Sequence, residues 1–347
     1  MLSTGRQAAS AVHCCTSNKG NVMEKKWALT ALIAVLIMAA LLRIDAASLA
    51  ASIQQVPLRL ILLLIGLQIV SQLLVNAQWY RIANIADVRI SFRDMLYVNC
   101  QGAVVDAITP GVKFGGEITR AVRLNKISGC GTEAAAAVVA LQKIFSISAL
   151  LAIQLFTVGH LFGMIPRLQA VHMQVLIFGV LLLFLLILAG VFFMAPQIMQ
   201  YLQKREEPQH TWLRRVRSFV YTLAEHIYVI RGNKASIAAF TILSVAIWVL
   251  YPGKMYLIAM QFAPEISWAY IAAITFAAYM VAMLPIFPGG LGGFEATMAG
   301  LLVVVGFAAS DAAVITIVFR FVTFWLVMLL SLLYCAIYRG RTFVRSG

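Results

Sequence analysis

The sequence predicts an all-α, polytopic membrane protein with about six full spans and two re-entrant helix pairs arranged as an inverted repeat. Composition is the first reason: of 347 residues, 62% are hydrophobic and 12% charged, and the mean hydropathy is +0.91. Soluble domains carry about 25% charged residues. The second reason is that the apolar residues form runs near the roughly 20 residues that cross a bilayer as a helix. A water-facing globule cannot bury this much apolar surface.

Six apolar runs are the predicted spans: 27–44, 58–80, 133–161, 171–195, 235–262 and 311–338. The first could instead belong to a signal peptide over 23–48, because Ala46-Ala47-Ser48 resembles a cleavage site. Arg43 and Asp45 argue against that alternative. The predicted organisation is a disordered or non-native tail at 1–22, a membrane domain over 23–340 with halves 23–195 and 235–340, a basic cytoplasmic interfacial loop at 196–234, and a cytoplasmic tail at 341–347.

The lysines and arginines predict the orientation of the spans, because cytoplasmic loops carry an excess of them. The formal net charge of +14 therefore indicates membrane orientation and not a nucleic-acid partner. The opposite loops hold only Arg43, Arg59 and Arg167. One topology fits if 95–112 enters the membrane from the cytoplasm and returns, and 268–308 does so from outside. Both termini are then cytoplasmic, and the basic loops are 23–26, 81–93, 113–126, 196–234 and 339–347.

The longest basic loop, 196–234, mixes cations with aromatic residues such as Trp212 and Tyr228. That mixture suits a helix lying on an anionic leaflet and recruiting headgroups. A solvated positive-inside loop is the simpler interpretation and the one we favour.

Two stretches broken by Pro and Gly repeat one motif. The first, 109–120, reads TPGVKFGGEITR, and the second, 287–297, reads FPGGLGGFEAT. Each is followed by a long span with one deep cation, Lys143 or Arg320. We interpret the pair as an internal repeat; two ordinary Gly-rich loops are the alternative. The coinciding pairs are Pro110 and Pro288, Gly111 and Gly289, Gly115 and Gly293, Glu117 and Glu295, and Thr119 and Thr297, and the break motifs also include Gly116, Pro285, Gly290 and Gly292.

A Pro-Gly break removes helical hydrogen bonds and permits close backbone approach. Within a membrane such a break is tolerated where it is buried in protein or lines a cavity, and paired breaks in corresponding halves point to a transporter's binding site. The expected substrate-binding residues are Glu117, Arg120, Lys143, Glu295 and Arg320, and Asp106 is a further ionisable residue near the first break.

Lys143 and Arg320 permit two interpretations that can coexist in alternating states. Each is costly within a membrane and should therefore have a partner. They suit an anionic headgroup such as a lipid phosphate. Alternatively, each neutralises the glutamate of its own repeat. Pro252 and Gly253 mark a third break, predicted to be a hinge beside Lys254.

The sequence lacks the motifs of common enzyme classes, including the GxSxG elbow, HExxH, the P-loop and the dinucleotide fingerprint. Its five cysteines are scattered without a CxxC pair, and its five histidines show no ligand spacing. We therefore expect no catalytic residue, no metal site and no cofactor. Membrane lipids are the expected partners, with a homo-oligomer as a further possibility.

The two motifs, Pro110 to Glu117 with Arg120 nearby and Pro285 to Glu295, together with the basic spans that follow, resemble the lysylphosphatidylglycerol synthase transmembrane region, also called the flippase-like domain family. The resemblance covers most of 27–340. It implies two inverted halves that move lipids or lipid-linked headgroups between leaflets. In the best-known members this region is fused to a soluble aminoacyl transferase, and because the sequence stops at Gly347 we expect no aminoacylating chemistry here.

The expected function is therefore an inner-membrane, flippase-like protein that moves an anionic or modified phospholipid, or a polyprenyl-linked lipid, between leaflets. A membrane-embedded glycosyl or lipid-headgroup transferase is one alternative, with Glu117 or Glu295 as the base. A non-transporting accessory protein of envelope biogenesis is another.

Overall fold

The computed structural model describes residues 46–109, 114–164, 170–205, 207–283 and 290–346, and these are helical with no strand among them. Five helical segments are long and apolar enough to cross a membrane, which confirms a multi-pass membrane protein. They correspond to five predicted spans, whereas the sixth, 27–44, lies outside the described residues. The five segments are α3 (Leu58–Ile85), α6 (Thr132–Met164), α7 (Val171–Lys204), α9 (Lys234–Ala259) and the continuous rod of α12 (Ala309–Arg320), the π-helical η2 (Phe321–Trp325) and α13 (Leu326–Ser346).

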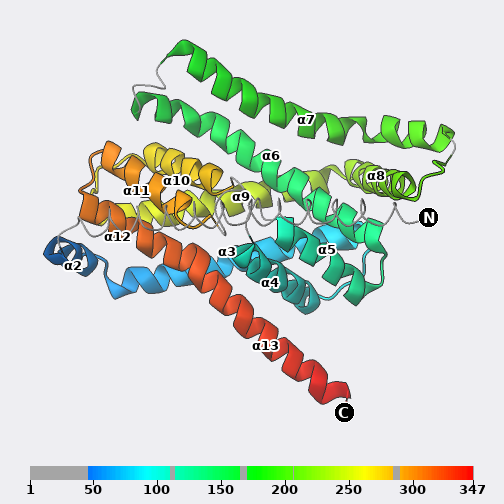
Figure 1. Cartoon of the computed structure of the whole chain (residues 1–347), viewed down its shortest axis with the longest axis horizontal. Helices are drawn as coiled ribbons and strands as arrows, with labels where there is room; N and C mark the ends of the chain where they lie inside the picture. The colour runs from blue at the N-terminus through cyan, green and yellow to red at the C-terminus, as the bar shows by residue number, and fades with distance from the viewer. Residues whose placement is uncertain (1–45, 110–113, 165–169, 206, 284–289, 347) are drawn as a thin grey trace, which may run out of the picture.

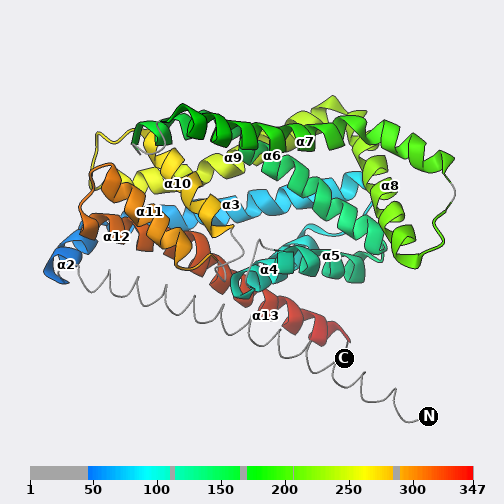
Figure 2. The same cartoon turned by 45° about the horizontal axis from the view of Figure 1, so that its top comes forward.

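Two helical hairpins occupy the stretches predicted to re-enter the membrane. The first consists of α4 (Phe92–Ile108) and α5 (Phe114–Ser128), and the second of α10 (Trp268–Ala282) and α11 (Gly293–Val304). Within each hairpin the two helices pack against each other. The hairpins lie toward opposite ends of the long helices (Figures 1 and 2). Entry from opposite faces of a membrane stays a prediction. Five residues of the break motifs lie outside the described residues: Pro110, Gly111, Pro285, Pro288 and Gly289.

Each hairpin is packed into its own apolar core. Around α4 and α5, buried side chains such as Met95, Leu124 and Leu141 form a cluster that extends to α3, α6 and α9. Around α10 and α11, a second cluster includes Phe294 and Phe319 and joins α3, α9 and α12. Because α3 and α9 contribute to both clusters, they connect the two halves of the bundle.

Helix α2 (Ala46–Gln54) contacts α12, where Ser52 Oγ donates a hydrogen bond to Asp311 Oδ1 at 2.7 Å.

Helix α7 shows both how the protein meets lipid and where the predicted boundaries are wrong. Leu183, Phe184 and Leu186 on this helix are exposed, as expected of side chains that face hydrocarbon. The helix does not end near residue 195 but continues to Lys204, because Gln, Met and Leu favour helix and because Ile198 and Met199 pack on the first core.

The remainder of the basic segment is also mostly helical, as α8 (Thr211–Arg231), and not a loop. Its placement at the cytoplasmic face stays a prediction. Ala224, Ile227 and Ile230 are buried on one face of α8. That apolar face packs against α6 and α7.

Helix α9 corrects a second expectation. It continues through Pro252 and Gly253 without the predicted break. A proline inside a helix removes one backbone hydrogen bond, a loss that neighbouring helices make tolerable within a membrane protein. Pro252 is buried between such neighbours. A hinge role for this position stays a prediction.

Candidate functional site: a charged cavity between the two halves

In the first hairpin, Arg120 is held between two carboxylates. Its Nη2 donates to Asp106 Oδ2 at 3.0 Å, and its Nη1 donates to Glu117 Oε1 at 2.8 Å. Gly102 on α4 provides the space, because a Cβ at that position would collide with the Arg120 side chain. The guanidinium also lies 5.7 Å from the ring centroid of Trp79. A charge network therefore joins α4 to α5.

Gly115 and Gly116 at the start of α5 allow a close approach between the two helices of this hairpin. The Gly116 N–H donates to Asp106 Oδ1 at 3.1 Å. A Cβ on Gly116 would overlap that carboxylate, and one on Gly115 would press against Thr109. Because a helix N-terminus favours negative charge, Asp106 stabilises the start of α5. The glycines of this motif thus serve a packing requirement.

Lys143 on α6 completes the first cluster. Its Nζ lies 2.6 Å from Glu117 Oε1, so one carboxylate is shared by Lys143 and Arg120. The Lys143 side chain is 35% exposed, compared with 12% for Arg120. Lys143 is therefore the more accessible cation of the cluster. Its pairing with the glutamate of its own repeat is one of the two arrangements considered from sequence.

In the second hairpin, Glu295 makes the corresponding pair. Its Oε1 accepts from Arg320 Nε at 2.6 Å, and its Oε2 accepts from the Gly292 N–H at 2.6 Å. Gly292 has a φ of 87°, which a residue with a Cβ adopts only with strain. Gly290 also has a positive φ and packs against Ala282. The glycines here shape the turn that places Glu295 in the first turn of α11.

Arg320 is enclosed by aromatic rings. Its guanidinium lies 4.6 Å from the ring centroid of Phe294 and 4.3 Å from that of Phe324. Its side chain is 8% exposed. The π-helical segment η2 begins directly after Arg320 and carries Thr323 and Phe324. A wide π-turn therefore lies next to the buried cation, a placement often seen at functional sites.

Both clusters meet at a cavity of about 230 Å³. Glu117, Arg120 and Lys143 line it from the first half, and Arg320 lines it from the second. Glu295 reaches the cavity through its ion pair with Arg320. The structure thus brings together the five charged residues predicted from sequence.

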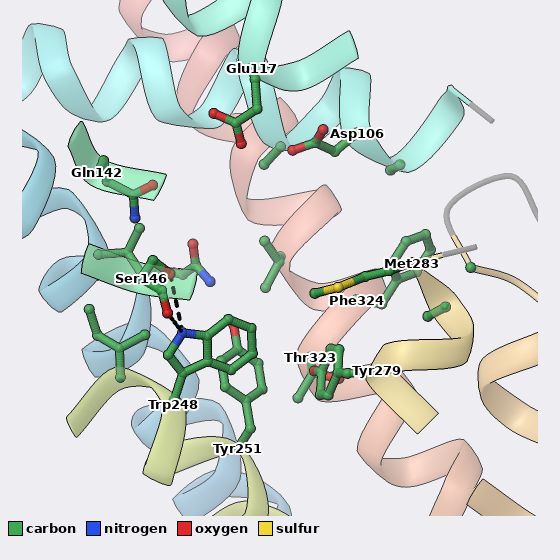
Figure 3. Close-up of a pocket in the computed structure, with 18 of the residues that line it drawn as sticks. Asp106, Glu117, Gln142, Ser146, Trp248, Tyr251, Tyr279, Met283, Thr323 and Phe324 are labelled. Carbon is green, nitrogen blue, oxygen red and sulfur yellow. Dashed lines mark hydrogen bonds between the residues drawn. The ribbon is translucent and has the colours of Figure 1, made fainter. Parts of the chain in front are cut away.

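One side of the cavity is charged and the other is aromatic. In Figure 3, Glu117 and Asp106 lie across the cavity from Trp248 and Tyr251, and Tyr279 and Phe324 form a further wall. Trp248 Nε1 donates to the Ser146 carbonyl at 2.8 Å, which fixes the indole in place. A headgroup in this space would contact charges on one side and ring faces on the other.

Sequence reasoning missed a chain of polar residues beside the charges. Gln142 Nε2 donates to Gln78 Oε1 at 3.2 Å, and Gln78 Nε2 donates to Ser244 Oγ at 2.5 Å. All three are buried and line the cavity. A carboxamide inside an apolar span was the available signal, because buried polar groups need partners.

Lys254, the remaining buried cation considered from sequence, is not among the residues that line the cavity. Its Nζ donates to Gln68 Oε1 at 2.5 Å and to Ser71 Oγ at 3.1 Å, and it lies 4.6 Å from the ring centroid of Tyr251. Tyr251 is itself one of the residues that line the cavity. The lysine therefore supports the wall of the site from behind.

Comparison with known sequences identifies the family to which this chain belongs. The sequence model of the family described as "Lysylphosphatidylglycerol synthase TM region" matches residues 27–331, which include both hairpins and both clusters. The chain belongs to this family.

Among its relatives are archaeal proteins named UPF0104 membrane protein. One from Methanothermobacter thermautotrophicus is 36% identical over 117 residues, an alignment that covers 33% of this chain and about a third (35%) of the relative. A longer alignment with a protein of the same name and organism is 24% identical over 315 residues, covering 88% and 93%. A relative from Pyrococcus horikoshii is 23% identical over 299 residues, covering 79% and 85%. Membership in the lysylphosphatidylglycerol synthase transmembrane family confirms the resemblance drawn from the two motifs.

Proposed function

We propose that this protein moves a lipid with a phosphate-bearing headgroup between the leaflets of the cell inner membrane, with both termini cytoplasmic. One observation carries the proposal: charged residues that follow both copies of the motif line a single cavity inside the bundle. Ionisable residues within a membrane are costly and mark substrate pathways. An anionic or modified phospholipid, or a polyprenyl-linked lipid, would place its headgroup in the cavity while its chains stay in the bilayer.

The charges of the described site balance, and this suggests how the site works. Three carboxylates (Asp106, Glu117 and Glu295) face three cations (Arg120, Lys143 and Arg320). An incoming phosphate must therefore take a cation from a carboxylate. Because Lys143 is the more exposed cation, it exchanges first. Arg320 follows when the second pair opens, since its planar guanidinium can bind a phosphate through two parallel hydrogen bonds.

The first test removes the accessible cation. Purified protein is reconstituted into liposomes with a fluorescent phosphatidylglycerol, and lipid movement is followed by chemical quenching of the outer leaflet. We expect Lys143→Gln to slow movement by at least tenfold, because the headgroup loses its first cation. Lys126→Gln, which removes an exposed lysine of the same hairpin outside the cavity, should match wild type. Equal rates for Lys143→Gln and Lys126→Gln would contradict the ion-exchange step.

The second test keeps the charge of Arg320 and changes its shape. Arg320→Lys retains a cation but loses the planar group between Phe294 and Phe324. If Arg320 binds phosphate, this variant inserts normally and moves lipid several-fold more slowly. Full lipid movement by Arg320→Lys would leave Arg320 as a structural partner of Glu295 alone.

A wild-type protein that moves no fluorescent phospholipid or polyprenyl phosphate would overturn the transport proposal as a whole.

A further inference from the structure

A second hollow, of about 430 Å³, lies between the C-terminal end of α7 and the N-terminal half of α8. Arg214, Arg215 and Arg217 line it, together with Leu202, Gln203, Ser218, Tyr221 and the two carboxylates Glu133 and Glu207. None of these residues lines the central cavity. The hollow is therefore a separate feature that the proposed transport step does not use.

Arg217 brings to the hollow a buried hydrogen-bond donor without an acceptor among the described residues. Its Nη2 donates to the carbonyls of Leu202 and Arg205, both at 2.5 Å, and so caps the end of α7. Its Nη1 is buried and has no hydrogen-bond partner in the described part of the chain. A buried donor without an acceptor is costly. An anionic oxygen in the hollow would satisfy it.

The balance of charge favours an anion. The described residues hold three guanidinium groups against two carboxylates at this site. Glu207 lies 3.8 Å from Arg214 Nε in an exposed pair, which is a weak interaction. Glu133 accepts a hydrogen bond from the Thr132 hydroxyl at 2.9 Å. Neither carboxylate forms an ion pair with Arg215 or Arg217 among the described residues.

The surroundings of the hollow suit the headgroup layer of a membrane. Trp212 on α8 is 64% exposed, and Tyr201 on α7 is exposed with Arg205 5.2 Å from its ring centroid. The C-terminal half of α8 is anchored in the protein by the buried side chains Ala224, Ile227 and Ile230. Exposed aromatic and basic side chains gathered at one end of a helix bundle are typical of a membrane interface. The positive-inside count assigns this end to the cytoplasmic leaflet, which carries anionic lipids.

We propose that Arg214, Arg215 and Arg217 bind the phosphate of an anionic phospholipid of the adjacent leaflet, at a site distinct from the central cavity. Charge-assisted bonds from guanidinium groups to phosphate are among the stronger hydrogen bonds in proteins. The site would hold α8 against the leaflet whether or not the central cavity is loaded. The proposed binding site does not depend on whether the protein moves lipid between leaflets.

Native mass spectrometry of the full chain, released from micelles containing dioleoylphosphatidylglycerol or dioleoylphosphatidylcholine, tests this. The double variant Arg214→Gln/Arg215→Gln leaves the Arg217 cap of α7 intact, and Lys126→Gln/Lys234→Gln removes the same charge from exposed lysines elsewhere. Both are made in a Lys143→Gln background, so that the central cavity binds less lipid and contributes equally to both variants and their parent. We expect the arginine variant to retain phosphatidylglycerol about tenfold less well than its parent, and the lysine variant to retain it within twofold.

Three results would overturn the proposal. Equal retention by the arginine variant and its parent would show that the hollow binds no lipid phosphate. An equal loss in the lysine variant would assign the binding to general surface charge. Displacement of phosphatidylglycerol by millimolar inorganic phosphate would identify a soluble phosphate compound as the ligand. Circular dichroism and size-exclusion chromatography confirm that each variant is folded before it is compared.

Discussion

The two copies of the motif use the same residue types in different ways. In the first, Glu117 is shared by Arg120 and Lys143, and Lys143 remains 35% exposed. In the second, Glu295 pairs with Arg320, which is 8% exposed and enclosed by rings. A shared, accessible carboxylate can exchange partners readily, whereas opening a sealed pair leaves a buried charge. One repeat therefore provides a pair that exchanges partners readily, and the other a pair that opens only at a higher cost in free energy.

The largest expected effect comes from breaking the sealed pair. Glu295→Ala leaves Arg320 without its carboxylate and leaves the Gly292 N–H without an acceptor. We expect a loss of about 3–5 kcal/mol in the free energy of unfolding, the usual cost of an orphaned buried charge. Thermal unfolding in detergent measures it, with the exposed Glu265→Ala as control. If both variants unfold at the same temperature, the second pair does not contribute to the stability of the fold as argued above.

An intermediate effect should follow from filling the contact between Gly116 and Asp106. Gly116→Ala forces a Cβ into the carboxylate and displaces it from the start of α5. The expected loss is about 1–3 kcal/mol, typical of overpacking. Gly66→Ala on α3 is the matched control, since nothing lies within 4 Å of a Cβ there. It should be neutral or slightly stabilising because alanine favours helix. Matching melting temperatures for the two variants would contradict the close approach.

The smallest effect on stability should come from Lys143→Gln, although we expect it to slow lipid movement strongly. A pair in which one side chain is about one-third exposed contributes at most about 1 kcal/mol. The melting temperature of Lys143→Gln should therefore stay within a few degrees of that of wild type. A drop as large as that of Glu295→Ala would show that the two pairs are equally structural.

Much of this arrangement could be predicted from the sequence because it depends on local patterns. Long apolar runs fixed the position of α3, α6, α7 and α9 to within a few residues at most ends, and the repeated motif located both hairpins. The equivalent spacing of Lys143 and Arg320 after their glutamates anticipated both ion pairs. Helical periodicity and the cost of buried charge suffice for inferences of this kind.

The missed features depend on contacts between segments distant in sequence. Trp248, Tyr251 and Tyr279 form a wall only once α9 and α10 pack together, and each alone is an ordinary apolar residue of a span. A helix within 196–234 was one of the two interpretations, but its packing into the bundle was missed because its buried positions, such as Ala224, Ile227 and Ile230, are too sparse for a search for membrane spans. A search for helical periodicity across 211–231 would have found it.

The π-helical turn η2 sets the rotational phase of the last helix. A π-turn contains one residue more than an α-turn, so removing one residue would rotate α13 by about 100° relative to α12. In the present phase Tyr338 stacks on Tyr97 of α4 with ring centroids 4.0 Å apart, and Tyr334 donates to the Arg93 carbonyl at 3.1 Å. Rotation would carry both tyrosines off α4 and Phe324 off Arg320. A single extra residue thus keeps the α12–η2–α13 helix in contact with both halves of the bundle, with Phe324 on the buried arginine and the two tyrosines on α4.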